Sequence, residues 1–141
     1  MTEQKKTGSC LCGQVRYEIT GPCRKVVYCH CEQCRRTSGH YVAATAVDTG
    51  DFALTEDSGL RWYRASNIAE RGFCATCGAS VLWKPDHGKY MAIMAGTLDA
   101  PTGLASREHI WVDFASDYYE IADGLPQFPR DHADLWEENE R

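Results

Sequence analysis

The residues of this chain best suited to chemistry are cysteines in tight clusters. Seven of its eight cysteines lie in three short segments, with one or two residues between neighbouring cysteines. The segments are Cys10-Leu-Cys12, Cys29-His-Cys31-Glu-Gln-Cys34 and Cys74-Ala-Thr-Cys77. Such short gaps let thiolates converge on one cation, and zinc prefers four ligands in a tetrahedron when its role is structural. The pattern therefore indicates a zinc protein.

Seven ligands favour two unlike zinc sites, and so two Zn²⁺ ions per chain. Seven divides most simply into a closed four-cysteine site and a three-cysteine site whose fourth position is open, as in catalytic zinc. One zinc ion bound by the first and last segments would close a loop of about 60 residues, and a cross-link stabilises the folded chain most when it closes a long loop. The structural site would then consist of Cys10, Cys12, Cys74 and Cys77. The open, catalytic site would consist of Cys29, Cys31 and Cys34.

A disulfide framework is the competing interpretation, because eight is an even number. Residues 1–6 are polar and lead into no apolar stretch, so we expect no secretory signal and a cytoplasmic protein, where disulfides are rare. Residues i and i+2 of an extended segment have Cα atoms about 6.5 to 7 Å apart, near the upper limit for a disulfide. Cys23 stands alone, and we expect it to pack as a small apolar residue.

An open zinc held by three thiolates favours a thiol as its fourth ligand. The three ligands already donate negative charge, so the ion is a poor Lewis acid and acidifies water weakly. A soft fourth ligand is preferred, and a thiol substrate is therefore a better hypothesis than hydrolysis. His30 lies between Cys29 and Cys31, and in an extended segment its ring would point away from the metal. We expect His30 to be a packing or surface residue.

Length and charge limit the remaining possibilities. A chain of 141 residues predicts one domain, which we place at residues 8–129, between a flexible tail at 1–7 and an acidic tail at 130–141. The net charge of -5, with basic residues only in isolated pairs, argues against a nucleic-acid partner. No apolar stretch approaches the roughly 18 residues of a membrane span, so we expect no membrane partner. The oligomeric state stays open.

Short strands must position the cysteines, because hydrophobic residues recur with the period of a strand. Val15, Tyr17 and Ile19 alternate with polar residues and predict a half-buried strand at 14–20. Further strands are expected at 25–29, 40–47, 60–64, 79–83, 90–95, 109–114 and 119–122. Helical signals are weak and predict only short helices at 32–37 and 131–138. The expected fold is mainly β with little helix.

Five ordered segments carry a family resemblance. They are Gly8-Ser-Cys-Leu-Cys-Gly-Gln-Val-Arg-Tyr17, Cys29-His-Cys-Glu-Gln-Cys-Arg-Arg-Thr-Ser-Gly39, Arg71-Gly-Phe-Cys-Ala-Thr-Cys-Gly78, Gly96-Thr-Leu-Asp-Ala-Pro101 and His109-Ile-Trp111. Together they resemble the glutathione-dependent formaldehyde-activating enzyme family, also called the centromere protein V family, over about residues 8 to 129. Two positions depart from the pattern: His40 stands where a small residue is expected, and Cys23 has no counterpart.

The resemblance implies a fold, an activity and site residues. The fold would be Mss4-like, with short antiparallel sheets clipped by zinc. The activity would be that of a carbon-sulfur lyase that joins glutathione to formaldehyde to give S-hydroxymethylglutathione. The positions matching the family's structural zinc site are Cys10, Cys12, Cys74 and Cys77, and those matching its catalytic zinc site are Cys29, Cys31 and Cys34.

Other functions stay open at the level of sequence. Lowering the pKa of a bound thiol accelerates its attack only a few-fold, because a weaker base is also a weaker nucleophile. A carrier that binds glutathione without catalysis is therefore the alternative. A structural zinc module that binds a protein through aromatic strands is a third class. Arg35 and Arg36 either bind the carboxylates of glutathione or lie on a solvated loop.

Overall fold

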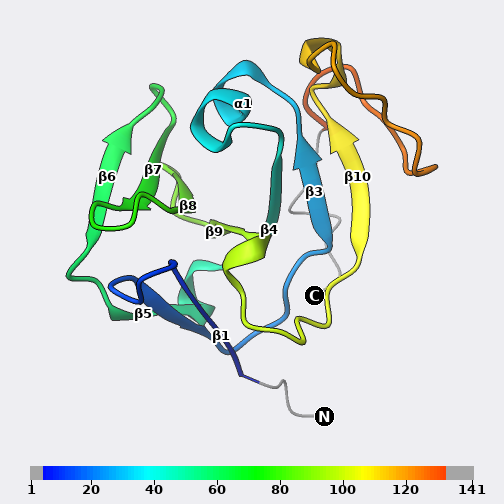
Figure 1. The fold of residues 1–141 in the computed structure, drawn as a ribbon. Coiled ribbons are helices and arrows are strands. Elements are labelled where there is room, and N and C mark those ends of the chain that lie inside the picture. Colours follow the sequence, from blue (N-terminus) through cyan, green and yellow to red (C-terminus); the bar gives the residue numbers. More distant parts are fainter. Residues whose placement is uncertain (1–4, 133–141) are drawn as a thin grey trace.

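Two β-sheets form the framework of the protein, as seen in a computed structural model that describes residues 5–132. The smaller sheet has the strand order β1-β2-β5, and the larger has the order β10-β3-β4-β9-β8-β7-β6 (Figure 1). The strands of the smaller sheet are β1 (Lys6–Ser9), β2 (Arg16–Ile19) and β5 (Phe52–Glu56). Those of the larger sheet are β3 (Val26–Cys29), β4 (Val42–Asp48), β6 (Leu60–Arg64), β7 (Ala69–Cys74), β8 (Ser80–Pro85), β9 (Tyr90–Met94) and β10 (Ser106–Ile110). The fold is mainly β, as predicted.

The hydrophobic core lies where the smaller sheet packs against the larger one. Tyr17 and Ile19 of β2 are fully buried against Leu82 and Ile93, which come from β8 and β9. Charged and polar residues of β2 alternate with these two and are less buried, so the alternation in the sequence identified the buried face correctly. Cys23 also packs against this core, as expected for a small apolar side chain.

The strand-helix-strand unit β3-α1-β4 carries the central cysteine segment. β3 pairs in parallel with β10 on one side and antiparallel with β4 on the other. The helix α1 (Glu32–Ser38) begins directly after β3, with Cys31 as its N-cap. It ends at Gly39, whose φ of 86° lies in the left-handed region that favours glycine. Two turns of helix thus hold the segment in a fixed geometry.

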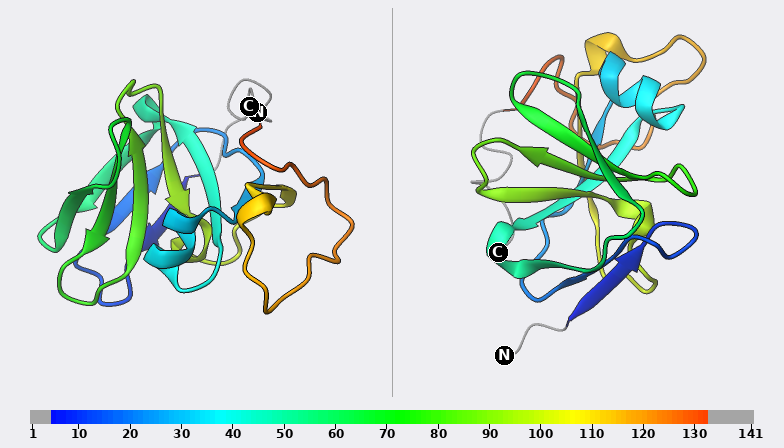
Figure 2. Two further views of the ribbon diagram at one scale, coloured as in Figure 1. Left: turned by 90° about the horizontal axis from the view of Figure 1, so that it is seen from above. Right: turned by 90° about the vertical axis from the view of Figure 1, so that its left-hand side faces the viewer.

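The polypeptide beyond β10 differs from the prediction. The strand expected at 109–114 is wrong beyond Ile110, where β10 ends, because Trp111 has a φ of 58° and a 3-10 turn, Val112–Phe114, follows it. The strand expected at 119–122 is wrong, since these residues form no strand. Residues 126–130 instead lie against β10, where the His109 amide donates to Pro126 and the Phe128 amide to His109 (Figure 2).

Three strands were not predicted, and each lacks a clear apolar alternation. β1 contains only small or polar residues, β5 is exposed except at Phe52, and β7 contains Glu70, Arg71 and Gly72 among its six residues. Pairing with neighbouring strands stabilises them, which sequence periodicity does not reveal. The short helix expected at 32–37 is confirmed, whereas most of the one expected at 131–138 lies outside the described residues.

The limits of the predicted domain remain a prediction. β1 begins at Lys6, within the segment expected to be a flexible tail, while residues 1–4 and 133–141 lie outside the described part of the chain. Within the described part, no helix has the length and apolar character needed to cross a membrane.

Candidate functional site

The first and last cysteine segments meet in one four-cysteine cluster. The sulfur atoms of Cys10, Cys12, Cys74 and Cys77 all lie within 4.8 Å of one another. Cys10 and Cys12 come from the connection between β1 and β2, Cys74 is the last residue of β7, and Cys77 lies in the turn between β7 and β8. Cys10 and Cys74 are buried, whereas Cys12 is exposed. The cluster therefore joins the smaller sheet to the larger one.

Backbone amides of both connections point at these sulfur atoms. The Val15 amide donates to Cys10 Sγ at 3.3 Å and the Cys77 amide to Cys74 Sγ at 3.5 Å. The amide of Ala79 also donates to the sulfur of Cys77 and is the main cause that lowers its pKa to about 6. Gly78, with a φ of 81°, makes the tight turn that allows this. Hydrogen bonds from backbone amides also lower the pKa of Cys74, so this turn favours the thiolate forms of Cys74 and Cys77, which are the forms that bind metal.

The central segment forms a separate three-cysteine cluster. The sulfur atoms of Cys29, Cys31 and Cys34 lie within 4.8 Å of one another, at the end of β3 and the first turn of α1. The Cys34 amide donates to Cys31 Sγ at 3.3 Å. Hydrogen bonding with Cys29 is the main cause that lowers the pKa of Cys31 well below its usual range, and it raises that of Cys29. The three thiols therefore share their protons unequally.

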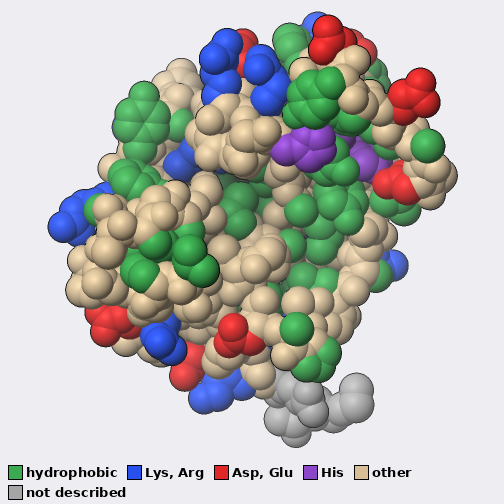
Figure 3. All heavy atoms as spheres, in the orientation of Figure 1, with side chains coloured by type: hydrophobic (Ala, Val, Ile, Leu, Met, Phe, Trp, Pro, Cys, Tyr) green, Lys and Arg blue, Asp and Glu red, His purple; other side chains and the backbone are tan. Residues whose placement is uncertain are grey.

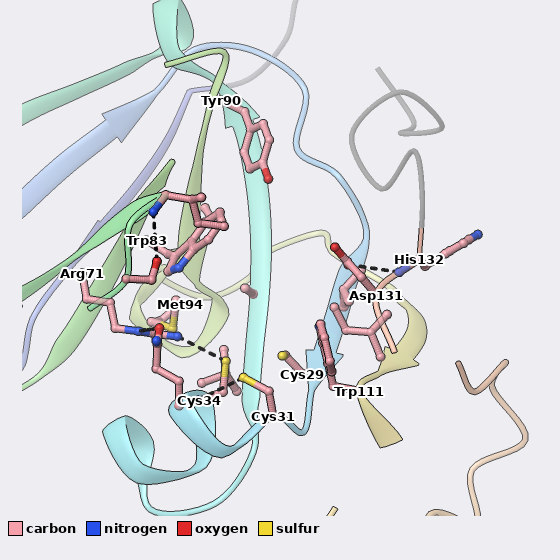
Figure 4. A pocket seen from close by; sticks show the side chains of 18 of the residues that line it. Cys29, Cys31, Cys34, Arg71, Trp83, Tyr90, Met94, Trp111, Asp131 and His132 are labelled. Atoms are coloured by element: carbon pink, nitrogen blue, oxygen red, sulfur yellow. Dashed lines mark hydrogen bonds between the residues drawn. The ribbon is translucent and has the colours of Figure 1, made fainter. Parts of the chain in front are cut away.

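A pocket of about 650 Å³ opens beside the three-cysteine cluster, and all three cysteines line it. None of the cysteines of the four-cysteine cluster does. Figure 4 shows the sulfur atoms facing the pocket between β3, α1 and β4. Its apolar lining includes Val27, Val42, Ala44, Ala92, Met94 and Ile110, and its aromatic lining consists of Trp83, Tyr90 and Trp111. The two clusters thus differ in access as well as in ligand number.

Arg71 is a functional candidate that the sequence did not single out. It lies on β7 and reaches across the pocket to α1 (Figure 4), where its side chain is buried with 6% exposed. Its Nε donates to Gln33 Oε1 at 2.7 Å and its Nη2 to Cys34 Sγ at 3.4 Å. The sequence showed Arg71 only as part of a motif, because β7 was not predicted and the direction of its side chains could not be assigned.

The arginines considered from the sequence lie elsewhere. Arg35 and Arg36 are on the helix α1 and do not line the pocket. Arg36 instead forms an ion pair with Glu32, with 2.9 Å between Arg36 Nε and Glu32 Oε2, and both side chains are exposed. The pocket is lined by Arg24 as well as Arg71.

His30 belongs to a polar network on the opposite side of β3 from the pocket. Its Nε2 lies 2.8 Å from His109 Nδ1, its Nδ1 lies 2.5 Å from Tyr119 Oη, and His109 Nε2 lies 2.8 Å from Asp123 Oδ2. Burial is the main cause that lowers the pKa of His30 to about 4, so its ring is neutral near neutral pH. Both of its nitrogens already have partners, and the ring takes no part in the sulfur cluster.

The surface near this network is rich in histidine and hydrophobic side chains, seen in Figure 3 between α1 and the end of β10. His40 is exposed, and its Nδ1 lies 2.7 Å from Tyr118 Oη. It does not line the pocket, so its departure from the family pattern lies outside that cavity.

The donor atoms of both clusters fit a soft metal ion. All seven are cysteine sulfurs, and sulfur ligands favour ions such as zinc over hard cations. Four sulfurs complete a tetrahedron, whereas three leave one position for another ligand. The fold and these residues define a mainly β protein with two cysteine clusters that could bind metals such as zinc.

Comparison with known proteins identifies the family. The chain belongs to the family described as glutathione-dependent formaldehyde-activating enzyme, whose model matches residues 5–114. A relative named an uncharacterized lyase, from Schizosaccharomyces pombe, is 27% identical over 126 residues, which are 88% of this chain and 90% of the relative. A crystal structure of a Rhodobacter sphaeroides protein has a similar fold, with a TM-score of 0.57 and 19% identity over 86% of this chain and 98% of that one.

Proposed function

We propose that the protein is a zinc-dependent carbon-sulfur lyase-type enzyme that joins glutathione to formaldehyde and gives S-hydroxymethylglutathione. The observation that carries the proposal is the opening of the three-cysteine cluster into a pocket that no cysteine of the four-cysteine cluster lines. Membership of the formaldehyde-activating family and the lyase name of the yeast relative support the reaction class.

The cysteines divide into two sets of proposed zinc ligands. Cys10, Cys12, Cys74 and Cys77 would hold a structural zinc. Cys29, Cys31 and Cys34 would hold the catalytic zinc, which when bound supplies a positive anchor for a thiolate sulfur. The ligand sets are proposed from the chemistry and mutual proximity of the sulfur atoms.

The pocket suits a ligand larger than formaldehyde. Its volume of about 650 Å³ lies within the range of roughly 300 to 1,000 Å³ that is usual for small-molecule sites. Apolar residues of β3, β4 and β9 form one wall, and Arg24, Arg71 and Lys89 place positive charge on the lining beside the carboxylate of Asp131. A thiol with carboxylate groups, such as glutathione, fits this combination of apolar and cationic surfaces.

The chemical step forms one carbon-sulfur bond. The thiol loses its proton to solvent, and the thiolate electron pair attacks the formaldehyde carbon. The carbonyl π pair moves to oxygen, and the resulting alkoxide takes a proton from solvent. One proton is lost and one is gained, so the hemithioacetal product contains all the atoms of the thiol and the aldehyde. The protein's contribution is to hold the thiol in place and to exclude water from the apolar wall.

Thiol activation alone cannot account for a large acceleration. Lowering the thiol pKa from about 8.5 to about 6.5 raises the thiolate fraction near neutral pH roughly 25-fold, while a Brønsted slope of about 0.4 to 0.5 removes roughly 6- to 10-fold. The net gain is only a few-fold. A larger effect requires the pocket to position the aldehyde against the sulfur, where effective molarity is high.

A non-catalytic glutathione carrier is the second candidate. Among the described residues, the side chain outside the cluster that hydrogen-bonds its sulfurs is Arg71, which is not a general acid or base. A site without a general acid or base beside the reacting sulfur is compatible with a protein that only binds the thiol, as well as with an enzyme. The two functions differ in whether the adduct forms faster than in buffer.

The test is the rate of adduct formation at equal thiol concentration. Zinc-loaded wild-type protein should form S-hydroxymethylglutathione faster than buffer does, and Cys31→Ser should lose the excess rate. Arg61→Gln is the matched control and should behave as the wild type, because Arg61 is exposed and does not line the pocket. Binding of glutathione without any excess rate would establish the carrier and overturn the enzyme, and absence of thiol binding would overturn both.

A further inference from the structure

Arg71 is a buried cation whose negative partner is the sulfur cluster. Only 6% of the residue is exposed, and among the described residues no carboxylate forms an ion pair with it. A buried charge without an opposite charge is strongly unfavourable. The groups that can supply that charge are the thiolates of the three-cysteine cluster, whose Cys34 Sγ lies 3.4 Å from Arg71 Nη2 and within 4.8 Å of the other two sulfurs.

The guanidinium is held in place by a neighbouring amide. Gln33 Oε1 accepts from Arg71 Nε at 2.7 Å, and Gln33 Nε2 in turn donates to the Ala65 carbonyl at 3.2 Å. The side chain of Gln33 thus links α1, β7 and the connection after β6. Arg71 Nη1 has no hydrogen-bond partner among the described residues, and Arg71 lines the pocket. That nitrogen can therefore donate to a bound molecule.

We propose that Arg71 is the counter-cation of the three-cysteine cluster and makes its open position accept an anionic ligand. Three thiolates and one divalent zinc carry a net charge of minus one. A fourth thiolate would raise it to minus two in a partly apolar pocket, which is unfavourable unless a cation lies nearby. Arg71 offsets one of these charges and donates a hydrogen bond to Cys34. The inference rests on the proposed function, because it concerns the fourth ligand of that site.

Arg71 acts in this proposal as a positioning residue for the metal and its ligand. Hydrogen bonds to metal ligands commonly change metal affinity about 10- to 100-fold when they are removed. Lysine would keep the positive charge but has a single nitrogen, so it could not replace the guanidinium, whose separate nitrogens donate to Gln33 and Cys34. Arg71→Lys should therefore retain part of the effect, whereas Arg71→Gln should lose it.

The experiment measures metal and ligand binding without any assay of activity. Zinc affinity of the weaker site is measured by competition with a chromophoric chelator in wild type, Arg71→Lys, Arg71→Gln and the exposed control Arg61→Gln. The expected loss is about 10- to 100-fold in Arg71→Gln, smaller in Arg71→Lys, and absent in Arg61→Gln. With cobalt in the site, the visible spectrum then reports binding of glutathione, an anionic ligand, and of imidazole, a neutral one.

Glutathione binding should weaken more than imidazole binding in Arg71→Gln. Equal weakening of both ligands, or metal affinity equal to wild type, would overturn the role of Arg71. Circular dichroism and occupancy of the four-cysteine cluster check the fold, and Arg71→Lys provides the test if Arg71→Gln is unfolded. Failure of the proposed function would look different, because glutathione would then leave the cobalt spectrum of the wild type unchanged.

Discussion

Cys34 and Cys74 are both buried cysteines, but their surroundings differ in what they offer a metal. Cys74 is fully buried in the core and lies among four mutually close sulfur atoms. Cys34 lines a pocket and has only two sulfur neighbours, together with the guanidinium of Arg71. The same residue type can therefore serve stability at one position and ligand binding at the other.

Replacement of each cysteine by serine separates these roles. Cys74→Ser should destabilise the protein by at least about 3 kcal/mol, lowering the melting temperature by about 10 °C, because it removes a ligand of the closed site. Cys34→Ser should melt close to the wild type and lose thiol binding. Thermal melts followed by circular dichroism and binding of glutathione measure both, and equal damage from the two substitutions would contradict the division.

Tyr17 should make the free energy of unfolding decrease at alkaline pH. Its phenol is buried, with Oη 2.7 Å from Thr97 Oγ1, and burial is the main cause that raises its pKa above the usual range. The unfolded chain releases this proton at about pH 10, whereas the folded chain keeps it, so the stabilisation is present below pH 10 and is lost as the pH rises towards the folded pKa.

Tyr17→Phe should remove this part of the pH dependence. At neutral pH the variant should lose about 1 kcal/mol with the hydrogen bond, while Thr97 still donates to the Met94 carbonyl. Denaturant unfolding at neutral pH and above pH 10 measures the difference between the proteins. The gap in stability between wild type and variant should narrow at alkaline pH, and a constant gap would contradict the prediction.

At the scale of elements, strands with one buried face were predictable and those defined by pairing were not. β2 and β9 were found from apolar residues such as Tyr17 and Ile93, and the two cysteine groups were found from their spacing. β7 has no such pattern, so Arg71 could not be placed in the pocket. The wrong prediction of a strand at 119–122 has a related cause. An aromatic residue is typical of a strand, but Tyr119 lies in a loop, where its hydroxyl bonds the His30 ring.

Gly59 lies just before β6, and its lack of a side chain leaves room for the sulfur of Cys74 in the four-cysteine cluster. A Cβ at this position would lie 2.8 Å from Cys74 Sγ and 2.9 Å from Gln14 Cβ, which is closer than such atoms approach. Gly59→Ala should cost about 1 to 3 kcal/mol by overpacking and weaken zinc binding at that cluster. Gly50→Ala is the control, because its Cβ would meet nothing within 4 Å.

Denaturant unfolding and chelator competition measure these two effects of the Gly59 substitution. If Gly59→Ala is as stable as Gly50→Ala and binds zinc equally well, the cluster is not held as tightly as the structure indicates.

At the scale of the whole molecule, the four-cysteine cluster closes a long loop. Cys12 and Cys74 are 62 residues apart, with 3.7 Å between their sulfurs, and they link the two sheets around the hydrophobic core. Most of the core consists of apolar side chains, and a cross-link over so long a loop restricts the unfolded chain considerably. The three-cysteine cluster spans only one turn of chain and contributes little in this way.

Metal removal should therefore occur in two stages. A mild chelator should first empty the three-cysteine site with little change in melting temperature. A stronger chelator should then empty the four-cysteine site and lower the melting temperature by about 10 °C or more, and added zinc should restore it. Thermal melts together with elemental analysis follow both stages, and loss of both ions in one step would speak against two unlike sites.

The most direct test of the central claim, one closed and one open sulfur site, is a cobalt titration of the metal-free protein. Two equivalents of cobalt should bind per chain, each with sulfur-to-cobalt charge-transfer absorption. Glutathione should change the absorption of one equivalent only, and Cys34→Ser should abolish that change. A single equivalent of cobalt, or two equivalents that both ignore glutathione, would contradict the claim.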